Sequence, residues 1–320
     1  MHGSPNPLQL AAVCLLALAS AVLPSFVGNA YVWFLVNLIL TNIVLALGLE
    51  LLIGRSGQFA FAHVAFFAVG AYGTAILQMK AGLPFVPSFV LSALSAGAIG
   101  MLIGVPATRM RSINLALATF AFAQGVTWLL GYWEGLTGGP AGMTVSAARL
   151  FGHEILNDDQ ATPWMGLIAS GALASVMYLA TSKLGRDFEA IKESEHAATV
   201  SGVHVHRTKV IAFALSGLYA GMAGGMLVLH RSFLVPDEFG FTTLVLVISM
   251  LVVGGLGSIG GVIIGVIIIT MLPQALQMGM REILVWQELV YGCLLILFMM
   301  FMPRGVWGAL HKAFARKGGA

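Results

Sequence analysis

Residues 31–53 read YVWFLVNLILTNIVLALGLELLI, and Glu50 is the one charged side chain among them. A helix needs about 20 apolar residues to cross the hydrocarbon core of a bilayer, and this stretch is long enough. Backbone groups find no water in lipid, so an apolar run of this length without strand alternation predicts a helix. We therefore predict a membrane-spanning helix over 31–53, and the rest of the chain repeats the pattern.

The composition of the 320-residue chain supports the same fold class. Hydrophobic residues make up 58% of the chain and charged residues 9%, whereas a soluble domain carries about 25% charged residues. A soluble protein this poor in charge could not cover its surface, but lipid accepts an apolar exterior. We predict an all-α polytopic membrane protein, with residues 1–320 forming a single transmembrane domain.

Hydrophobic windows place about ten transmembrane helices along the chain. No Lys or Arg precedes the first window, so it lacks the basic region of a cleaved signal peptide and is predicted to be a retained span. The run GGLGSIGG at 254–261 is either a tight turn or a re-entrant break, and its glycines predict close helix packing. The predicted spans cover residues 8–28, 31–53, 59–79, 86–107, 113–133, 163–181, 208–231, 239–256, 258–274 and 284–302.

The distribution of Lys and Arg predicts the orientation of these spans. With ten spans and a cytoplasmic N-terminus, 12 of the 16 Lys and Arg residues fall on the inside and 4 on the outside. Cytoplasmic loops carry the excess of positive charge in membrane proteins. Both termini are therefore predicted to be cytoplasmic, with a periplasmic loop at 134–162 and a cytoplasmic loop at 182–209.

The cytoplasmic loop 182–209 is unusually rich in charge. It holds 9 of the 29 charged residues of the chain, which are 16 Lys and Arg plus 13 Asp and Glu. Within it, the stretch GRDFEAIKESEHAATVSG from residue 185 is predicted to form a helix. Leu184, Phe188 and Ile191 lie at i, i+4 and i+7 and form one apolar stripe, so the helix is amphipathic.

The polar face of this predicted helix carries charges of both signs. Arg186 and Glu189 are three residues apart, as are Glu189 and Lys192, so these pairs can support the helix. One interpretation is a solvated connector or a helix lying on lipid, although lipid-surface helices favour Lys and Arg on their polar face. The balanced charge favours the other interpretation, in which the helix docks to another protein with its apolar stripe against that partner.

Five stretches of the chain, taken in order, resemble the permease subunits of branched-chain amino acid ABC importers, in particular the M-type subunit (the LivM family). Each stretch is weak alone because Gly-rich apolar runs are common in membranes, but together they cover nearly the whole chain. They are GRSGQFAFAHVAFFAVGAY (54–72), LTGGPAGM (136–143), GRDFEAIKESEHAATVSGV (185–203), VVGGLGSIGGVIIG (252–265) and FMPRGVWG (301–308).

The resemblance implies an importer in the bacterial inner membrane, built from this permease and a second permease of the H type. Two cytoplasmic ATPase subunits would bind the ATP, and a periplasmic binding protein would deliver Leu, Ile or Val. This chain would be no enzyme, hold no cofactor and bind no nucleic acid. The amphipathic helix would be the coupling helix that sits in a cleft of the ATPase. Its residues assigned to coupling are Leu184, Gly185, Arg186, Phe188, Glu189, Ala190, Ile191 and Glu193.

Four residues are candidates for the substrate path. Ser56, Gly57 and Gln58 interrupt the apolar pattern between the second and third spans, and transporters place sites at broken helices. The alternative is a plain cytoplasmic turn. His63 lies on the following span, where a His is a functional candidate by default but can equally bond a neighbouring carbonyl.

Other polar residues call for structural interpretations. A charge at the centre of a spanning helix costs about 2.5–3.5 kcal/mol on insertion scales, so Glu50 and Glu288 are expected near helix ends or facing the bundle. Glu50 is expected to snorkel or to pair with Arg55. His204 and His206 have the spacing of a metal pair but no third ligand near them in the sequence, so no metal site is predicted.

Two other classes of membrane protein, ion-coupled transporters and enzymes, can be compared with the sequence. An ion-coupled secondary transporter would carry charged residues at mid-depth, whereas here charge is concentrated in one cytoplasmic loop. The catalytic motifs HExxH and GxSxG are absent, as is the P-loop, so ATP hydrolysis would come from another chain. Ala60 and Ala62 stand where the family usually has Ser and Gly, and related permeases import urea or short amides, so this alternative substrate class stays open.

Overall fold

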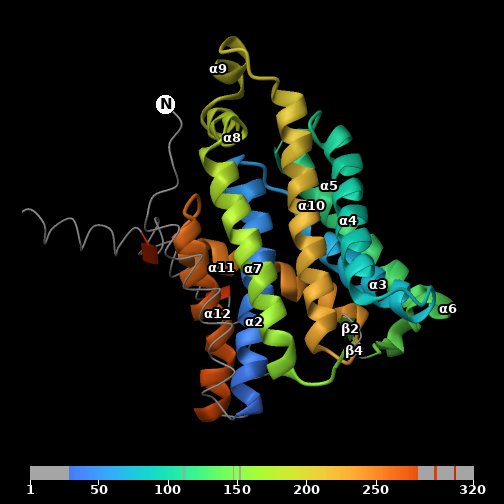
Figure 1. Ribbon diagram of the computed structural model, residues 1–320. Helices are drawn as coiled ribbons and strands as arrows, with labels where there is room; N and C mark the ends of the chain where they lie inside the picture. The colour runs from blue at the N-terminus through green and yellow to red at the C-terminus, as the bar shows by residue number, and fades with distance from the viewer. Residues whose placement is uncertain are drawn as a thin grey trace, which may run out of the picture.

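The computed structural model describes residues 29–110, 112–146, 148–150, 153–279, 292–293 and 306–307. The predicted span 8–28 lies outside the described residues, as does 284–302 except for two positions. Between them, apolar helices stand where the other spans are predicted (Figure 1). They are α2 (Ala30–Leu49) with its π-helical continuation η2 (Glu50–Arg55), α3 (His63–Met79), α4 (Phe85–Ala107), α5 (Ser112–Tyr132), α7 (Asp158–Thr181), α10 (Val205–His230), α11 (Phe241–Gly254) and α12 (Ile259–Gly279).

Five of these helices are long and apolar enough to cross a membrane, and α3, α11 and α12 are shorter apolar helices. The prediction of an all-α membrane protein is therefore confirmed for the described part of the chain. The total of ten spans stays a prediction.

Short elements close the two ends of the bundle. One end carries α8 (Lys183–Glu193) and α9 (Glu195–Val200), seen at the top of Figure 1. The opposite end carries two antiparallel strand pairs, β1 with β4 and β2 with β3. The short elements outside α8 and α9 are α6 (Glu134–Thr137), η3 (Gly139–Ala141), β1 (Met143–Thr144), β2 (Ala148–Leu150), β3 (His153–Ile155), β4 (Phe233–Leu234) and η4 (Pro236–Phe239).

Helix α10 is the centre of the bundle, with α2, α3 and α4 packed around it. Its approach to α4 is close because glycines face backbone on both sides. A Cβ added at Gly217 would lie 2.5 Å from the Ala96 carbonyl oxygen, and one at Gly100 would lie 2.5 Å from the Phe213 carbonyl oxygen. Since lipid is itself apolar, such close backbone packing is what drives helices together in a membrane.

The run GGLGSIGG is a tight turn between α11 and α12. Gly255 and Gly257 have φ values of 111° and 89°, in the region that favours glycine. Next to the turn the two helix backbones touch, since a Cβ at Gly261 would lie 2.5 Å from the Gly254 carbonyl oxygen. The close packing of these glycines is confirmed, and the choice between two spans and a re-entrant segment over 239–274 stays a prediction.

Helix α11 is shorter than the predicted span 239–256. Its 14 residues extend about 21 Å, less than the hydrocarbon core of about 30 Å. In the preceding 3-10 turn η4, Phe239 is fully buried, with its ring centroid 5.1 Å from that of Phe67 and 5.6 Å from that of Tyr72. The 3-10 turn η4 therefore enters the bundle before α11 starts.

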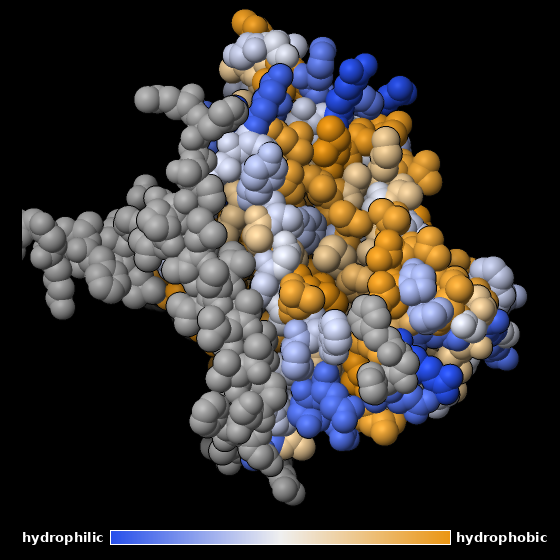
Figure 2. Space-filling view, in the orientation of Figure 1, coloured by the Kyte–Doolittle hydropathy of each residue, from blue (hydrophilic) through white to orange (hydrophobic). Residues whose placement is uncertain are grey.

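The outer faces of α4, α5 and α7 expose large apolar side chains. Leu102, Ile113 and Leu167 are examples with most of their surface exposed. Figure 2 shows hydrophobic side chains across the middle of the molecule and hydrophilic ones toward both ends. This apolar belt between polar ends is the exterior that a bilayer requires.

Candidate functional site

The corner between α7 and α8 is built by two small residues. The Ser182 side chain caps α8 by accepting a hydrogen bond from the Gly185 N–H at 3.4 Å. A Cβ at Gly185 would collide with the carbonyl oxygens of Leu179 and Ala180 at the end of α7. The corner thus turns the chain directly from α7 into α8, and α8 is held against the end of the bundle.

The apolar stripe of α8 faces its own chain. Phe188 is fully buried and Ile191 is 4% exposed. Phe188 belongs to a core cluster with Leu52 and Phe213, and Leu184 packs against the same cluster. The prediction of an amphipathic helix is confirmed, but the expectation that its stripe packs against a partner is wrong, because these side chains are buried within this chain.

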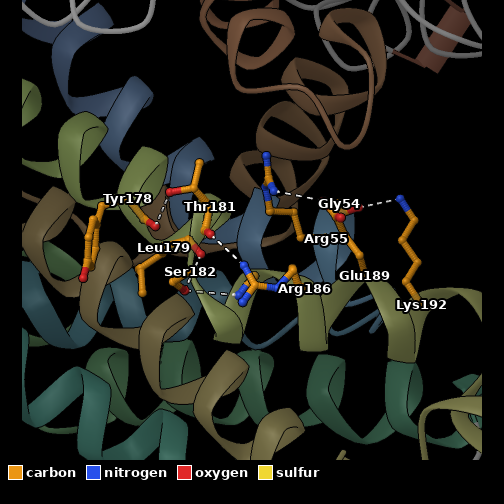
Figure 3. A network of polar contacts seen from close by, with 10 residues as sticks. Gly54, Arg55, Tyr178, Leu179, Thr181, Ser182, Arg186, Glu189 and Lys192 are labelled. Atoms are coloured by element: carbon orange, nitrogen blue, oxygen red, sulfur yellow. Dashed lines mark hydrogen bonds and ion pairs between the residues drawn. The ribbon is translucent and has the colours of Figure 1, made fainter. Parts of the chain in front are cut away.

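Polar contacts fasten α8 to the π-helix η2, as Figure 3 shows. Arg55 Nη1 and Glu189 Oε1 form an ion pair at 3.2 Å. Lys192 Nζ donates a hydrogen bond to the Gly54 carbonyl oxygen at 2.6 Å. Of the charged side chains expected to pair along α8, Glu189 and Lys192 therefore reach across to η2 at the end of α2 instead.

A third contact closes the other side of α8. Arg186 Nη1 donates a hydrogen bond to the Thr181 carbonyl oxygen at 3.1 Å, which satisfies a free carbonyl in the last turn of α7 (Figure 3). The residue surfaces of Arg186, Glu189 and Glu193 are exposed, and Ala190 is half-buried. These four residues form the outer face of α8, which is the face available to a partner.

The predicted single helix over residues 185–202 is two helices. Ser194 is extended, with φ −163° and ψ 118°, and its side chain accepts a hydrogen bond from the Ala197 N–H. Serine favours this capping position, so α8 ends and α9 begins there. In α9, Glu195 pairs with Lys209 of α10 at 2.6 Å, which fixes the second helix to the bundle as well.

The loop of Ser56, Gly57 and Gln58 lies beneath α8. Ser56 Oγ donates to the Leu52 carbonyl oxygen at 2.7 Å, and Gln58 Nε2 donates to Ser56 Oγ at 3.0 Å. Gly57 has φ +70°, and a Cβ there would lie 3.1 Å from Lys192 Cγ. The three residues are thus a compact turn in contact with α8, and their assignment to a substrate path stays a prediction.

His63 ties three helices together. Its Nε2 lies 2.8 Å from the Leu45 carbonyl oxygen, and its Nδ1 lies 2.8 Å from Ser216 Oγ. A carbonyl oxygen only accepts, so Nε2 carries the proton and Nδ1 accepts from the serine hydroxyl. Both ring nitrogens are satisfied by α2 and α10, which supports the carbonyl-bonding interpretation and leaves its place on a substrate path a prediction.

Glu50, the first residue of η2, is fully buried, and neither carboxylate oxygen has a hydrogen-bond partner within 3.5 Å among the described residues, although the Gly257 backbone N–H acts on the carboxylate. The expectation that it snorkels or pairs with Arg55 is wrong, since Arg55 pairs with Glu189 instead. The positive charges of Arg55 and Lys192 nevertheless act on the carboxylate. A Cβ at Gly54 would collide with it, so the carboxylate fills the space that this glycine leaves.

A cavity of about 320 Å³ adjoins this network at the outer edge of η2. The cavity is lined both by the turn between α11 and α12, through Gly257, and by α8, through Glu193. Its lining residues are Gly54, Arg55, Glu189, Lys192, Glu193 and Gly257.

The sequence did not point to Glu50 or Lys192 as members of this site. Both act at the π-helix η2, which holds Glu50 and offers the Gly54 carbonyl oxygen to Lys192, and the hydrophobic pattern carries no signal for a π-helix. Of the two histidines with the spacing of a metal pair, His206 contacts the Thr108 hydroxyl through its Nδ1. Within the described residues no cluster of three or more metal-ligating side chains forms, and the prediction of no metal site stays a prediction.

Comparison with known proteins places the chain among transport permeases. The family described as "Branched-chain amino acid transport system / permease component" matches residues 31–299. No solved structure matches this chain.

Three curated relatives show the range of the similarity. The chain is 30% identical to the high-affinity branched-chain amino acid transport system permease protein LivM of Escherichia coli K12, covering 100% of this chain and 80% of that protein. It is 26% identical to LivH of the same strain, covering 84% of this chain and 91% of LivH. It is 31% identical to the xylose transport system permease protein XylH of that strain, covering 45% of this chain and 38% of XylH.

Proposed function

Because this chain belongs to the family of branched-chain amino acid transport permeases, we propose that it is the M-type membrane subunit of an ATP-driven importer. Residues 31–299 carry the family match, and the chain is a multi-pass membrane protein by its helices. The proposed location is the bacterial inner membrane, with both termini in the cytoplasm. The chain itself would hold no cofactor, and its partner subunits would bind the ATP.

The proposed coupling role rests on one observation, which is that the outer face of α8 is exposed while its inner face is fastened to the bundle. Its inner face is buried against Leu52 and Phe213, and the ion pair with Arg55 and the Lys192 hydrogen bond clamp it to η2. A partner that grips the exposed Arg186 and Glu193 would therefore move the end of α2 with α8. Two cytoplasmic ATPase subunits are the proposed partners. Of the coupling residues assigned from the sequence, those proposed to meet the ATPase are Arg186, Glu189, Ala190 and Glu193 of the outer face.

The proposed substrates are Leu, Ile and Val, delivered by a periplasmic binding protein. The similarity to LivM supports them because it extends over the whole chain, whereas the similarity to XylH covers less than half. The similarity to LivH supports a second permease of the H type as the partner in the membrane. Urea and short amides are the alternative substrates.

Reconstitution tests the proposal. The chain is placed in proteoliposomes with the second permease, the ATPases and the binding protein encoded beside it, and uptake of labelled leucine is measured. We expect uptake that requires ATP and the binding protein. An ion-coupled transporter is the rival that the buried carboxylate of Glu50 would suit, and leucine uptake driven by a proton or sodium gradient without ATP would overturn the proposal.

A further inference from the structure

A cavity of about 670 Å³ opens at the end of the bundle opposite α8. This volume lies within the roughly 300–1,000 Å³ of small-molecule sites. Its walls come from the starts of α2 and α7, the end of α10 and the β2–β3 hairpin. The lining residues are Ala30, Trp33, Val145, Ser146, Ala148, Ile155, Leu156, Asn157, Asp158, Asp159, Val228, Leu229, His230, Arg231 and Ser232.

Arg231 supplies a positioned positive charge on one wall. Its guanidinium carbon lies 5.3 Å from the centroid of the Phe34 ring, and its buried Nε has no hydrogen-bond partner. Among the described residues no carboxylate oxygen lies within 4.0 Å of its nitrogens, although its charge acts on Asp158. Its charge acts on Glu238 as well, and a guanidinium has five N–H donors in a geometry that matches a carboxylate.

Asp158, which also lines the cavity, supplies a positioned negative charge. Asn37 Nδ2 donates to Asp158 Oδ1 at 3.2 Å and to its backbone oxygen at 3.0 Å. Thr162 Oγ1 donates to Asn37 Oδ1 and to the Asp158 backbone oxygen, both at 2.8 Å. This network holds the carboxylate through one of its two oxygens, and Asp159 adds a second, exposed carboxylate beside it.

His230 is a second, independent observation that points to a ligand in the cavity. It lines the cavity, and both its ring nitrogens are buried without a hydrogen-bond partner in the part of the chain that the structure describes. Buried polar groups are normally satisfied, because leaving one unsatisfied costs about 1–3 kcal/mol. The ring is held edge-on to Phe34 with centroids 6.0 Å apart, so packing keeps it in this unsatisfied place.

The rest of the wall is aliphatic and aromatic. Trp33, Val228 and Leu229 are each no more than 6% exposed, and Ile155 is 7% exposed. The cavity thus combines a cation, a carboxylate and an apolar wall, which are the complements of a carboxylate, an ammonium and an apolar side chain.

We infer that this cavity binds a free α-amino acid with an apolar side chain. Arg231 would hold the α-carboxylate, Asp158 would hold the α-ammonium, and the side chain would lie against Val228 and Leu229. The inference deepens the proposed function and rests on it for the identity of the ligand. With α8 facing the cytoplasm, the cavity opens toward the periplasm, where a binding protein would release its cargo.

A ligand series tests the charges separately. The full chain is prepared in nanodiscs, and binding of leucine, leucinamide and 4-methylpentanoate is measured by displacement of labelled leucine. The amide lacks the carboxylate and the acid lacks the ammonium, so we expect each to bind about tenfold or more weakly than leucine, as loss of a hydrogen bond to a charged group predicts. Equal binding of all three ligands would overturn the inference.

Variants assign each charge to its residue. Arg231→Gln should weaken leucine binding about tenfold and abolish the preference for leucine over leucinamide. Asp158→Asn should abolish the preference for leucine over 4-methylpentanoate. Arg149→Gln and Glu154→Gln are matched controls, because these residues pair with each other on the exposed β2–β3 hairpin outside the cavity lining. Unchanged selectivity in Arg231→Gln would contradict the assignment, whether or not affinity falls.

Two further experiments distinguish a bound lipid from a bound amino acid, and a failure of this inference from a failure of the proposed function. An ethanolamine phospholipid head group has the same pair of charges, so binding is repeated with and without phosphatidylethanolamine in the nanodiscs. We expect leucine affinity to be unaffected, and its loss in phosphatidylethanolamine would assign the cavity to lipid and overturn the inference. In the reconstituted transporter, an unchanged KM for leucine in Arg231→Gln would reject the cavity and leave the proposed function intact. A wild-type transporter that imports no amino acid would reject the proposed function itself.

Discussion

Arg55 at the end of η2 and Glu189 in the middle of α8 form an ion pair, with Nη1 and Oε1 3.2 Å apart although the two residues are 134 positions apart in the sequence. Arg55 is 11% exposed at its side chain, whereas Glu189 is 60% exposed. The pair therefore joins the buried end of a spanning helix to a helix surface that a partner can reach.

We expect the charge reversal Glu189→Arg to uncouple transport from ATP hydrolysis, because it places two cations together at the joint between α8 and η2. Arg55 is nearly buried, and removing the partner of a buried charge destabilises a protein, so uptake is normalised to the amount of protein in the membrane. The measurement is leucine uptake against ATPase rate in proteoliposomes. The swap Arg55→Glu with Glu189→Arg rebuilds the pair and should restore uptake, and a swap no better than the single variant would sink the idea.

Charge reversal at Arg186 should act at the outer face. The Arg186→Glu side chain cannot donate to the Thr181 carbonyl oxygen, and it presents the wrong charge to a partner. We expect co-purification with the ATPase to weaken by roughly tenfold, about 1.4 kcal/mol of binding free energy. The conservative Arg186→Lys can still donate and should keep most of the affinity. Full ATPase binding by Arg186→Glu would show that the partner grips another surface.

Truncation of Phe188 should destabilise the protein even though it lies in a surface helix. The side chain is fully buried, and Phe→Ala in a core costs about 3–5 kcal/mol. We expect a lower thermal unfolding midpoint in detergent and less protein in the membrane. Val200→Ala is the matched control at the same end, since Val200 is 90% exposed and should unfold as wild type does. An unchanged midpoint for Phe188→Ala would mean that α8 is not packed on this bundle.

Gly54→Ala should lower stability by about 1–3 kcal/mol, the cost of overpacking a core, because the new methyl group collides with the Glu50 carboxylate. Gly171→Ala is the control, because a Cβ there meets nothing within 4 Å and alanine favours the helix. Combining Gly54→Ala with Glu50→Ala removes the collision. The double variant should be more stable than the sum of the two single effects predicts, and simple additivity in thermal unfolding would contradict the contact.

Helix positions could be predicted from sequence because apolar length and turn residues are local properties. The windows at 86–107 and 113–133 match α4 and α5 closely, and the glycine run at 254–261 matches a turn. The periodicity of Phe188 and Ile191 showed that one face of α8 is buried. Periodicity does not say what covers a face, and here the cover is Leu52 and Phe213 of the same chain.

The candidate site was less predictable because it depends on contacts between distant segments. The break at Ser194 carried a signal, since serine is a preferred cap, but the helical periodicity continued across it. Glu50 could be placed near a helix end by the cost of its charge, yet its burial follows from the π-helix and from the space left at Gly54. These are properties of three-dimensional packing.

The inward-facing stripe of α8 has a mechanical consequence. A helix held to the bundle only at its two ends could shift under force without moving the other helices. With Phe188 in the core and Lys192 bonded to the backbone of Gly54, α8 and α2 are instead joined as one rigid unit. A displacement of the outer face of α8 would therefore move η2 and the rest of α2 together. That movement would include the Leu45 carbonyl oxygen, which bonds His63.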